Sequence, residues 1–159
     1  MLHLFDTATQ TVRPLAMREP GHLSIYLCGP TVYGPPHLGH GRATVEYDIL
    51  RRYLEWTGLE VRLVSNITDI DDKIIRRSQE NNEPMGDLTA RFIEAMHEDA
   101  DRLGVLRPDQ EPRATEHMDG ILEMIAQLEA NGYAYAGANG DVYYEVGRFE
   151  GYGKLSGKK

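Results

Sequence analysis

Two histidines and a cysteine stand together in "CGPTVYGPPHLGHGR", the stretch from Cys28 to Arg42. His37 and His40 are three residues apart, so at the start of a helix both imidazoles lie on one side of the first turn. A helix N-terminus offers free backbone N–H groups and a positive dipole end, which suit a phosphate. Gly39 and Gly41 carry no side chain, so a flat ligand can approach the backbone closely. The stretch therefore predicts a nucleotide site.

Other interpretations of the same residues stay open at this point. The two histidines could be zinc ligands, but no second Cys or His cluster nearby completes a set of four. Cys28 is the chain's only cysteine, so it is an apolar filler, a reactive thiol or one ligand of a metal held mainly by other groups. The stretch is neither G-x-x-x-x-G-K-[ST] nor G-x-G-x-x-G, which excludes the two common phosphate loops.

A second polar cluster is "TDIDD", from Thr68 to Asp72. Acidic residues often occupy the first turn of a helix, where they favour the dipole. Alternatively, the carboxylates and the Thr68 hydroxyl could receive a substrate ammonium group or hold magnesium. Both interpretations remain open from the sequence.

The elements around these clusters form a β-strand, helix, β-strand unit. "HLSIYLCG" (22–29) and "LEVRLVSNIT" (59–68) alternate as strands do, and apolar residues at helical spacing follow Arg42 as far as Gly58. Such a unit has parallel strands and a right-handed crossover. Because ligands of open α/β sheets bind beyond the carboxyl ends of the strands, the two clusters are expected to face one site.

The rest of the chain reads as mostly helical. Helices are expected over 74–81 and 88–103, then a proline-marked connection over 105–112 and a third helix capped by Thr115. The segment 133–146 predicts a small hairpin that turns at Gly-Ala-Asn-Gly. The fold class is α/β with a Rossmann-like parallel sheet, but only two parallel strands are expected, so either the chain is a fragment or the sheet is completed in a way that the sequence does not reveal.

Composition limits the class of protein. A chain of 159 residues with 41% hydrophobic and 26% charged residues fits one globular domain. A formal charge of -8 argues against a broadly basic surface that coats nucleic acid, although it leaves room for a local RNA-binding patch. No run approaches about 18 apolar residues and the N-terminus lacks a signal-peptide pattern, so a cytoplasmic protein without a membrane partner is expected.

Five blocks together carry a family likeness: "YLCGPTVYGPPHLGHGR", "VSNITDIDDKIIRRS", "PRATEHM", "GDVYYEV" and "YGKLSG". In this order they resemble the bacterial cysteinyl-tRNA synthetase family, which is a class I aminoacyl-tRNA synthetase family. His37-Leu38-Gly39-His40 matches the class I motif His-Ile-Gly-His. The resemblance implies that these four residues bind ATP. It also implies that His37 and His40 stabilise charge at the α-phosphate while the amino acid carboxylate attacks.

The resemblance also implies a cysteine pocket. Cys28 matches one of four zinc ligands, and the zinc in this family selects cysteine by binding its thiolate. Thr68 matches a residue near the bound amino acid, and Gly29 and Thr31 match the same pocket. The implied partners are ATP with magnesium, cysteine and cysteine tRNA, and the implied state is a monomer.

The resemblance implies a domain organisation. Residues 1–85 match the first half of the Rossmann-like catalytic domain, and 86–159 match part of its connective insertion. The second catalytic half, the other three zinc ligands, the Lys-Met-Ser-Lys-Ser loop and the anticodon-binding domain are expected to be missing. The isolated chain is therefore expected to be weakly active or inactive. Gly34 stands where the family commonly has aspartate, so that contact is absent or supplied elsewhere.

Two alternatives share some of these features. A ligase that joins activated cysteine to an amino sugar in mycothiol synthesis uses the same scaffold and would keep Cys28 and both histidines. A truncated paralogue could bind nucleotide without catalysis. The blocks "CGPTVY" and "TDIDDKII" favour the synthetase.

Overall fold

A computed structural model describes residues 2–157. The chain divides into two compact units. One is Met17–Glu116, and the other contains the described residues on either side of it. The two sequence clusters both lie in the Met17–Glu116 unit.

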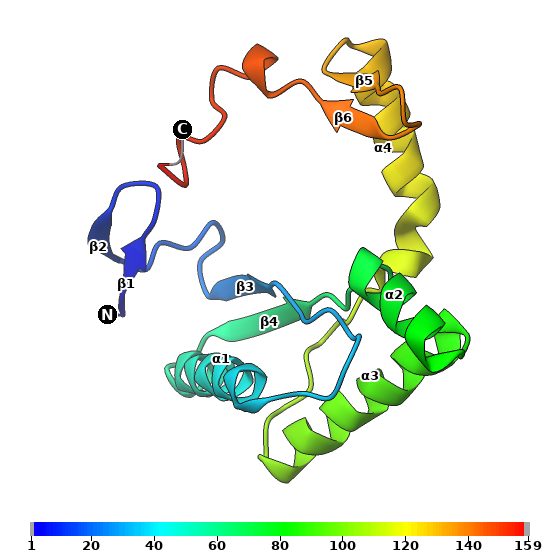
Figure 1. Ribbon diagram of the computed structural model, residues 1–159. Coiled ribbons are helices and arrows are strands. Elements are labelled where there is room, and N and C mark those ends of the chain that lie inside the picture. Colours follow the sequence, from blue (N-terminus) through cyan, green and yellow to red (C-terminus); the bar gives the residue numbers. More distant parts are fainter. Residues whose placement is uncertain (1, 158–159) are drawn as a thin grey trace. The chain divides into compact units, whose positions relative to one another are not determined.

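Strands β3 (His22–Leu27) and β4 (Glu60–Ser65) form a parallel pair, and helix α1 (Leu38–Trp56) connects them (Figure 1). His22 lies opposite Glu60 and Leu27 opposite Ser65. The pairing resumes after the strands, where Thr31 lies opposite Thr68. The predicted β-strand, helix, β-strand unit is confirmed.

A third parallel segment pairs with β4 on the edge away from β3. The Ser65 N–H donates to the Gln110 carbonyl at 3.0 Å, and the Ile67 N–H donates to the Pro112 carbonyl at 2.9 Å. Helices α2 (Asp72–Asn81) and α3 (Met85–Arg102) lead from β4 to this segment. The stretch read from the sequence as a plain connection therefore contributes to the sheet, and β4 lies in its middle.

Charged side chains of α1 hold this segment in place. Asp48 is buried, accepts the Leu106 N–H at 3.0 Å and pairs with Arg52 at 2.7 Å. Arg51 pairs with Asp109 at 3.1 Å, and the other Asp109 oxygen accepts the Leu63 N–H at 2.7 Å. These contacts join α1, β4 and the 104–109 loop on one side of the sheet.

The apolar core lies where the strand ends meet α3. Val32, Ile67 and Ile93 form a buried cluster, and Phe92 and Met96 pack against it. These residues come from the loop after β3, the segment just after β4, and the inner face of α3. The core therefore supports the floor of the predicted site.

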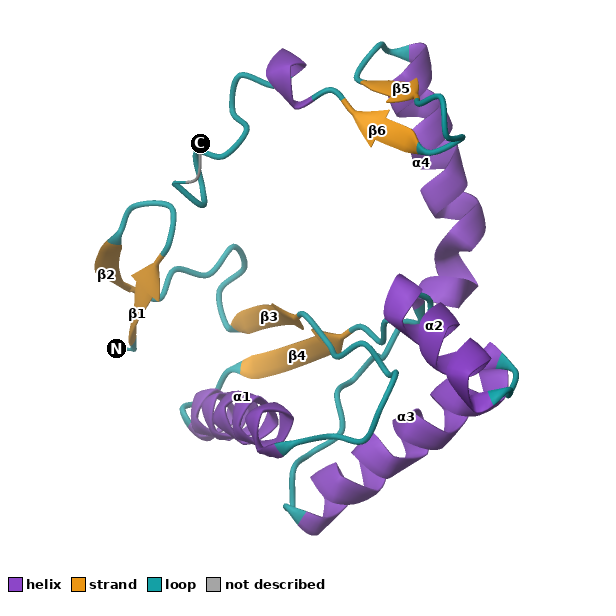
Figure 2. Ribbon diagram, in the orientation of Figure 1, coloured by secondary structure: helices purple, strands orange, loops and turns teal. Residues whose placement is uncertain are grey.

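The other unit contains two hairpins and a helix (Figure 2). β1 (His3–Asp6) pairs antiparallel with β2 (Thr11–Pro14), a hairpin that the sequence did not predict. After the 3-10 helix η1 (Ala114–His117) come α4 (Met118–Ala130), β5 (Ala134–Ala136), β6 (Val142–Tyr144) and the 3-10 helix η2 (Val146–Arg148). The pairing of β5 with β6 confirms the small hairpin. Within residues 2–157, no helix is both long and apolar enough to cross a membrane.

The predicted cap at Thr115 is wrong. The residue before α4 is His117, and its side chain makes no capping hydrogen bond. Thr115 lies within η1 and binds Asp69 instead, through its N–H at 2.9 Å and its hydroxyl at 2.6 Å. A capping threonine accepts a backbone N–H through its hydroxyl oxygen, whereas here the Thr115 hydroxyl donates to a buried carboxylate that folding brings close.

Candidate active site

The two histidines form a capping box at the start of α1. His37 is the N-cap residue with extended backbone angles, and its Nδ1 accepts the Gly39 N–H at 3.1 Å. In return the His37 N–H donates to Nδ1 of His40 at 3.2 Å. The two rings stack with centroids 3.8 Å apart and planes inclined by 20°. The imidazoles therefore lie side by side, as their spacing predicts.

These hydrogen bonds decide where the imidazole protons lie. A backbone N–H can only donate, so each Nδ1 that accepts one is unprotonated and the proton of the neutral ring lies on Nε2. Burial lowers the pKa of His40 below its ordinary value of 6.5, and the neighbouring His37 lowers that pKa further. The lowered pKa of His40 favours its neutral form, so its Nε2–H is a donor beside the free N–H groups of a helix start. Such a group of donors suits an anion.

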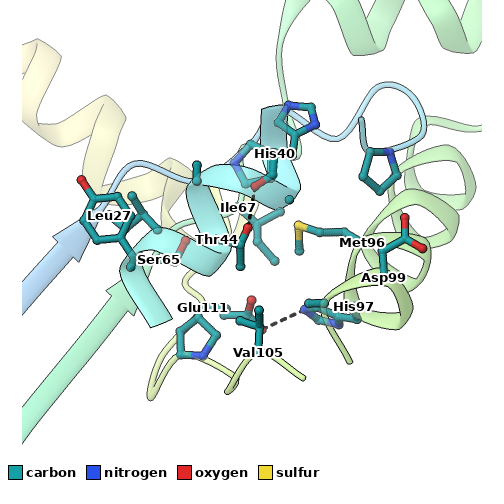
Figure 3. A pocket seen from close by; sticks show the side chains of 18 of the residues that line it. Leu27, His40, Thr44, Ser65, Ile67, Met96, His97, Asp99, Val105 and Glu111 are labelled. Carbon is teal, nitrogen blue, oxygen red and sulfur yellow. Dashed lines mark hydrogen bonds and ion pairs between the residues drawn. The ribbon is translucent and has the colours of Figure 1, made fainter. Parts of the chain in front are cut away.

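A cavity of about 330 Å³ lies beside this helix start (Figure 3). Four of the predicted site residues line it, namely Cys28, Gly29, Thr31 and His40. The opposite wall comes from α3, where Met96, His97 and Asp99 lie, and His97 Nε2 is 2.9 Å from a Glu111 carboxylate oxygen. The other four predicted residues, His37, Leu38, Gly39 and Thr68, are not part of the lining. The cavity thus brings together half of the predicted set.

Gly29 contributes through the closeness of two backbones. A Cβ added at Gly29 would lie 1.5 Å from the Asn66 carbonyl oxygen. The Gly29 N–H also donates to Asn66 Oδ1 at 2.9 Å. The ends of the two strands can approach this closely because residue 29 has no side chain.

Asn66 is a site residue that the sequence reasoning missed. It lines the cavity and contacts two predicted residues, Gly29 and Thr68. A usable signal was present, because an amide at the end of an apolar strand must find hydrogen-bond partners once the strand is buried.

Cys28 carries an exposed free thiol. Among residues 2–157, no group of three His, Cys, Asp or Glu side chains is placed to hold a metal ion, and the remaining residues are Met and Lys. A structural zinc site needs four ligands. The residues that the structure describes therefore do not complete a zinc site around Cys28.

Two of the aspartates in the acidic cluster have structural partners. Asp71 caps α2 by accepting the Lys73 N–H at 2.8 Å. Asp69 is buried and accepts both hydrogen bonds from Thr115. For these two residues the structure favours a structural role, as a helix cap and as a hydrogen-bond partner of Thr115, over the binding of an ammonium group or magnesium.

The family described as "tRNA synthetases class I (C) catalytic domain" matches residues 14–159. The chain belongs to this family. The resemblance read from the sequence is confirmed, and the capping-box histidines and the adjoining cavity belong to a class I synthetase catalytic domain.

Several relatives of this synthetase domain are named cysteine–tRNA ligase. The protein from Chromohalobacter salexigens is 54% identical over 157 residues, which cover 99% of this chain and 34% of that protein. The protein from Thioalkalivibrio sulfidiphilus is 56% identical over 159 residues, which cover 100% of this chain and 35% of that protein. The chain thus spans about a third of the length of the curated relatives it matches.

A solved structure is similar in fold. Mycobacterium tuberculosis methionyl-tRNA synthetase, in complex with methionyl-adenylate, matches with a TM-score of 0.61 and 18% sequence identity over 72% of this chain and 22% of that one. At this identity the likeness concerns the fold alone. It confirms the predicted α/β, Rossmann-like class for this synthetase domain.

Proposed function

We propose that the chain supplies the ATP-binding first part of a cysteine–tRNA ligase. In this reaction the carboxylate of cysteine attacks the α-phosphorus of ATP, pyrophosphate leaves, and the cysteinyl group of the adenylate then passes to cysteine tRNA. The observation that carries the proposal is the histidine pair at the start of α1, whose Nε2–H groups are free to donate beside the cavity. The names and identities of the relatives support the choice of cysteine.

The predicted residues have defined roles in this proposal. His37 and His40 donate from Nε2 to oxygens of the α-phosphate, where negative charge grows as the carboxylate attacks. Leu38 and Gly39 place the backbone N–H groups of the first turn near the phosphates, and magnesium accompanies ATP as part of the substrate. Gly29, Thr31 and Thr68 lie at the two strand ends, where the amino acid would bind.

Zinc stays a prediction that rests on the family resemblance. Cys28 would supply one thiolate, and when bound the metal would supply selectivity for a thiol-bearing substrate. Residues 2–157 complete no ligand set, so no step above depends on the metal. The domain division at residue 85, the monomeric state and the cytoplasmic location also remain predictions. The comparisons do not favour the mycothiol-type ligase or the non-catalytic module.

A segment exchange tests the proposal. The 159-residue chain replaces the aligned segment of the Thioalkalivibrio sulfidiphilus ligase, which is 56% identical over that length. The assays are cysteine-dependent exchange of pyrophosphate into ATP and charging of cysteine tRNA. We expect both activities, with no exchange when serine or methionine replaces cysteine.

Two controls make the result decisive. The parental ligase sets the attainable rate, and His40→Ala in the chimaera should lower exchange by at least about 100-fold, since it removes a donor to the developing charge. A folded chimaera without exchange, or one equally active with serine, would contradict the proposal. By itself the 159-residue chain is expected to show weak or no charging.

A further inference from the structure

We infer that Asn66 is a positioning residue for the amino-acid side of the site: its side chain bridges Gly29 and Thr68 and sets the direction in which Thr68 presents its hydroxyl group. The inference rests on the proposed function, because Thr68 is predicted to lie against the bound amino acid. Asn66 directly follows β4, and it lines the cavity.

The orientation of the Asn66 amide follows from its partners. The Gly29 N–H can only donate, so the atom 2.9 Å from it is the amide oxygen. The amide nitrogen then faces Thr68 Oγ1 at 3.3 Å and donates to it. One side chain therefore joins the end of β3 to the hydroxyl at the end of β4.

The backbone around this bridge has little freedom. The Thr68 N–H donates to the Pro30 carbonyl at 3.1 Å, and the Val32 N–H donates to the Thr68 carbonyl at 3.2 Å. Gly29 is so close to Asn66 that a Cβ there would overlap the Asn66 carbonyl. These contacts fix the backbone on both sides. Asn66 can therefore still determine only the torsion of the Thr68 side chain and the direction of its O–H bond.

The bridge gives Thr68 a defined polarity. A hydroxyl group has one proton and two acceptor lone pairs. Because Asn66 donates to the oxygen, the Thr68 proton must point away from Asn66 and is available to another acceptor. The capping box of His37 and His40 is closed by its own hydrogen bonds, so a change at Asn66 should leave the ATP side in place.

Asn66→Asp in the active chimaera tests this role. The carboxylate has nearly the size of the amide and still accepts the Gly29 N–H, but it cannot donate to Thr68 and instead takes the Thr68 proton. We expect the KM for cysteine in pyrophosphate exchange to rise about tenfold, which corresponds to one lost hydrogen bond to substrate, while the KM for ATP stays unchanged. A loss of fold would raise both.

Thr68→Val supplies the matched comparison. If Asn66 acts through Thr68, the single changes raise the KM for cysteine by similar factors, and the double variant is no worse than Thr68→Val alone. Losses that multiply in the double variant, an equal rise in both KM values, or an unchanged KM for cysteine would each overturn the inference.

A measurement without activity separates this inference from the proposed function. In the 15N spectrum of the 159-residue chain, the Asn66 side-chain amide protons should exchange slowly with solvent and should shift on Thr68→Val. If Thr68→Val leaves the Asn66 amide signals unchanged, the inference is overturned even if the chimaera charges tRNA. If the Asn66 amide signals shift on Thr68→Val but the chimaera is inactive, the proposed function is refuted. The bridge would then have a structural role only.

Discussion

The histidine capping box should make the start of α1 sensitive to acid. Each Nδ1 accepts a backbone N–H, and protonation of Nδ1 turns that acceptor into a donor that opposes the N–H. The imidazolium charge would also face the positive end of the helix dipole. Protonation of His40 should therefore open the hydrogen bond that its Nδ1 accepts from the His37 N–H.

The size of the effect follows from the number of bonds lost. An N-cap hydrogen bond contributes about 1 kcal/mol, so losing the one that His40 accepts costs about 1 kcal/mol. The folded-state pKa of His40 lies below 6.5, so between that pKa and 6.5 the unfolded chain binds more protons than the folded one. This contribution is therefore fully present above pH 6.5 and is lost as the pH falls through the folded-state pKa.

The double substitution His37→Ser with His40→Glu isolates this contribution. Serine at the N-cap and glutamate three residues later form an ordinary capping box whose acceptors do not protonate near pH 6. Urea unfolding at about pH 7.5 should give similar free energies for the variant and the wild type. At about pH 5 the variant should be more stable than the wild type by about 1 kcal/mol.

Other titrating groups cancel in this comparison. His22 pairs with Glu60 and His97 pairs with Glu111 in both proteins, and the charged residues Asp48 and Asp99 of the cavity wall are also shared. Equal losses of stability on acidification in variant and wild type would refute the assignment of His40 Nδ1 as an acceptor. A greater loss in the variant would refute it as well.

Two further predictions concern the strand ends, each measured by urea unfolding. Gly29→Ala should lower the free energy of unfolding by about 3 kcal/mol or more, because the methyl group would lie 1.5 Å from the Asn66 carbonyl oxygen. Gly34→Ala is the control, since no heavy atom lies within 4 Å of the new methyl group. It should change the free energy of unfolding by less than about 0.5 kcal/mol. Similar effects of the two would contradict the close approach. Asp69→Ala should cost about 2 to 3 kcal/mol because it leaves both Thr115 donors without their acceptor, and Asp69→Asn should cost less since one carbonyl oxygen remains. Equal costs would show that the hydrogen bonds to Thr115 do not carry the effect.

The periodic spacing of apolar residues predicted the strands and the helix that such spacing defines. The alternation over 22–29 and 59–68 and the helical spacing between them located β3, α1 and β4 to within a few residues. The third parallel segment has no such pattern, because it pairs through the carbonyls of Gln110 and Pro112 and is rich in charged and proline residues. A segment held by its backbone and by ion pairs leaves little trace in an apolar pattern.

Only part of the site could be predicted from the sequence. The spacing of His37 and His40 places both rings on one side of a helix start, which the structure confirms. Their use as caps, and the role of Asn66 as a bridge, depend on acceptors that come close only after folding. Side-chain to backbone contacts between strand ends that are 37 residues apart in sequence are set by strand register, which no local pattern encodes.

The capping box separates the needs of the fold from those of the chemistry. Serine and glutamate satisfy the same two backbone N–H groups, so the stability of α1 alone gives no reason for histidine at either position. What histidine adds is a second nitrogen: with Nδ1 engaged by the backbone, Nε2 carries a proton that serine and glutamate cannot place at that distance from the helix start. The double variant should therefore fold with normal stability at neutral pH and still lose pyrophosphate exchange in the chimaera. Retained exchange would mean that the backbone N–H groups of the first turn bind the phosphates without the imidazoles.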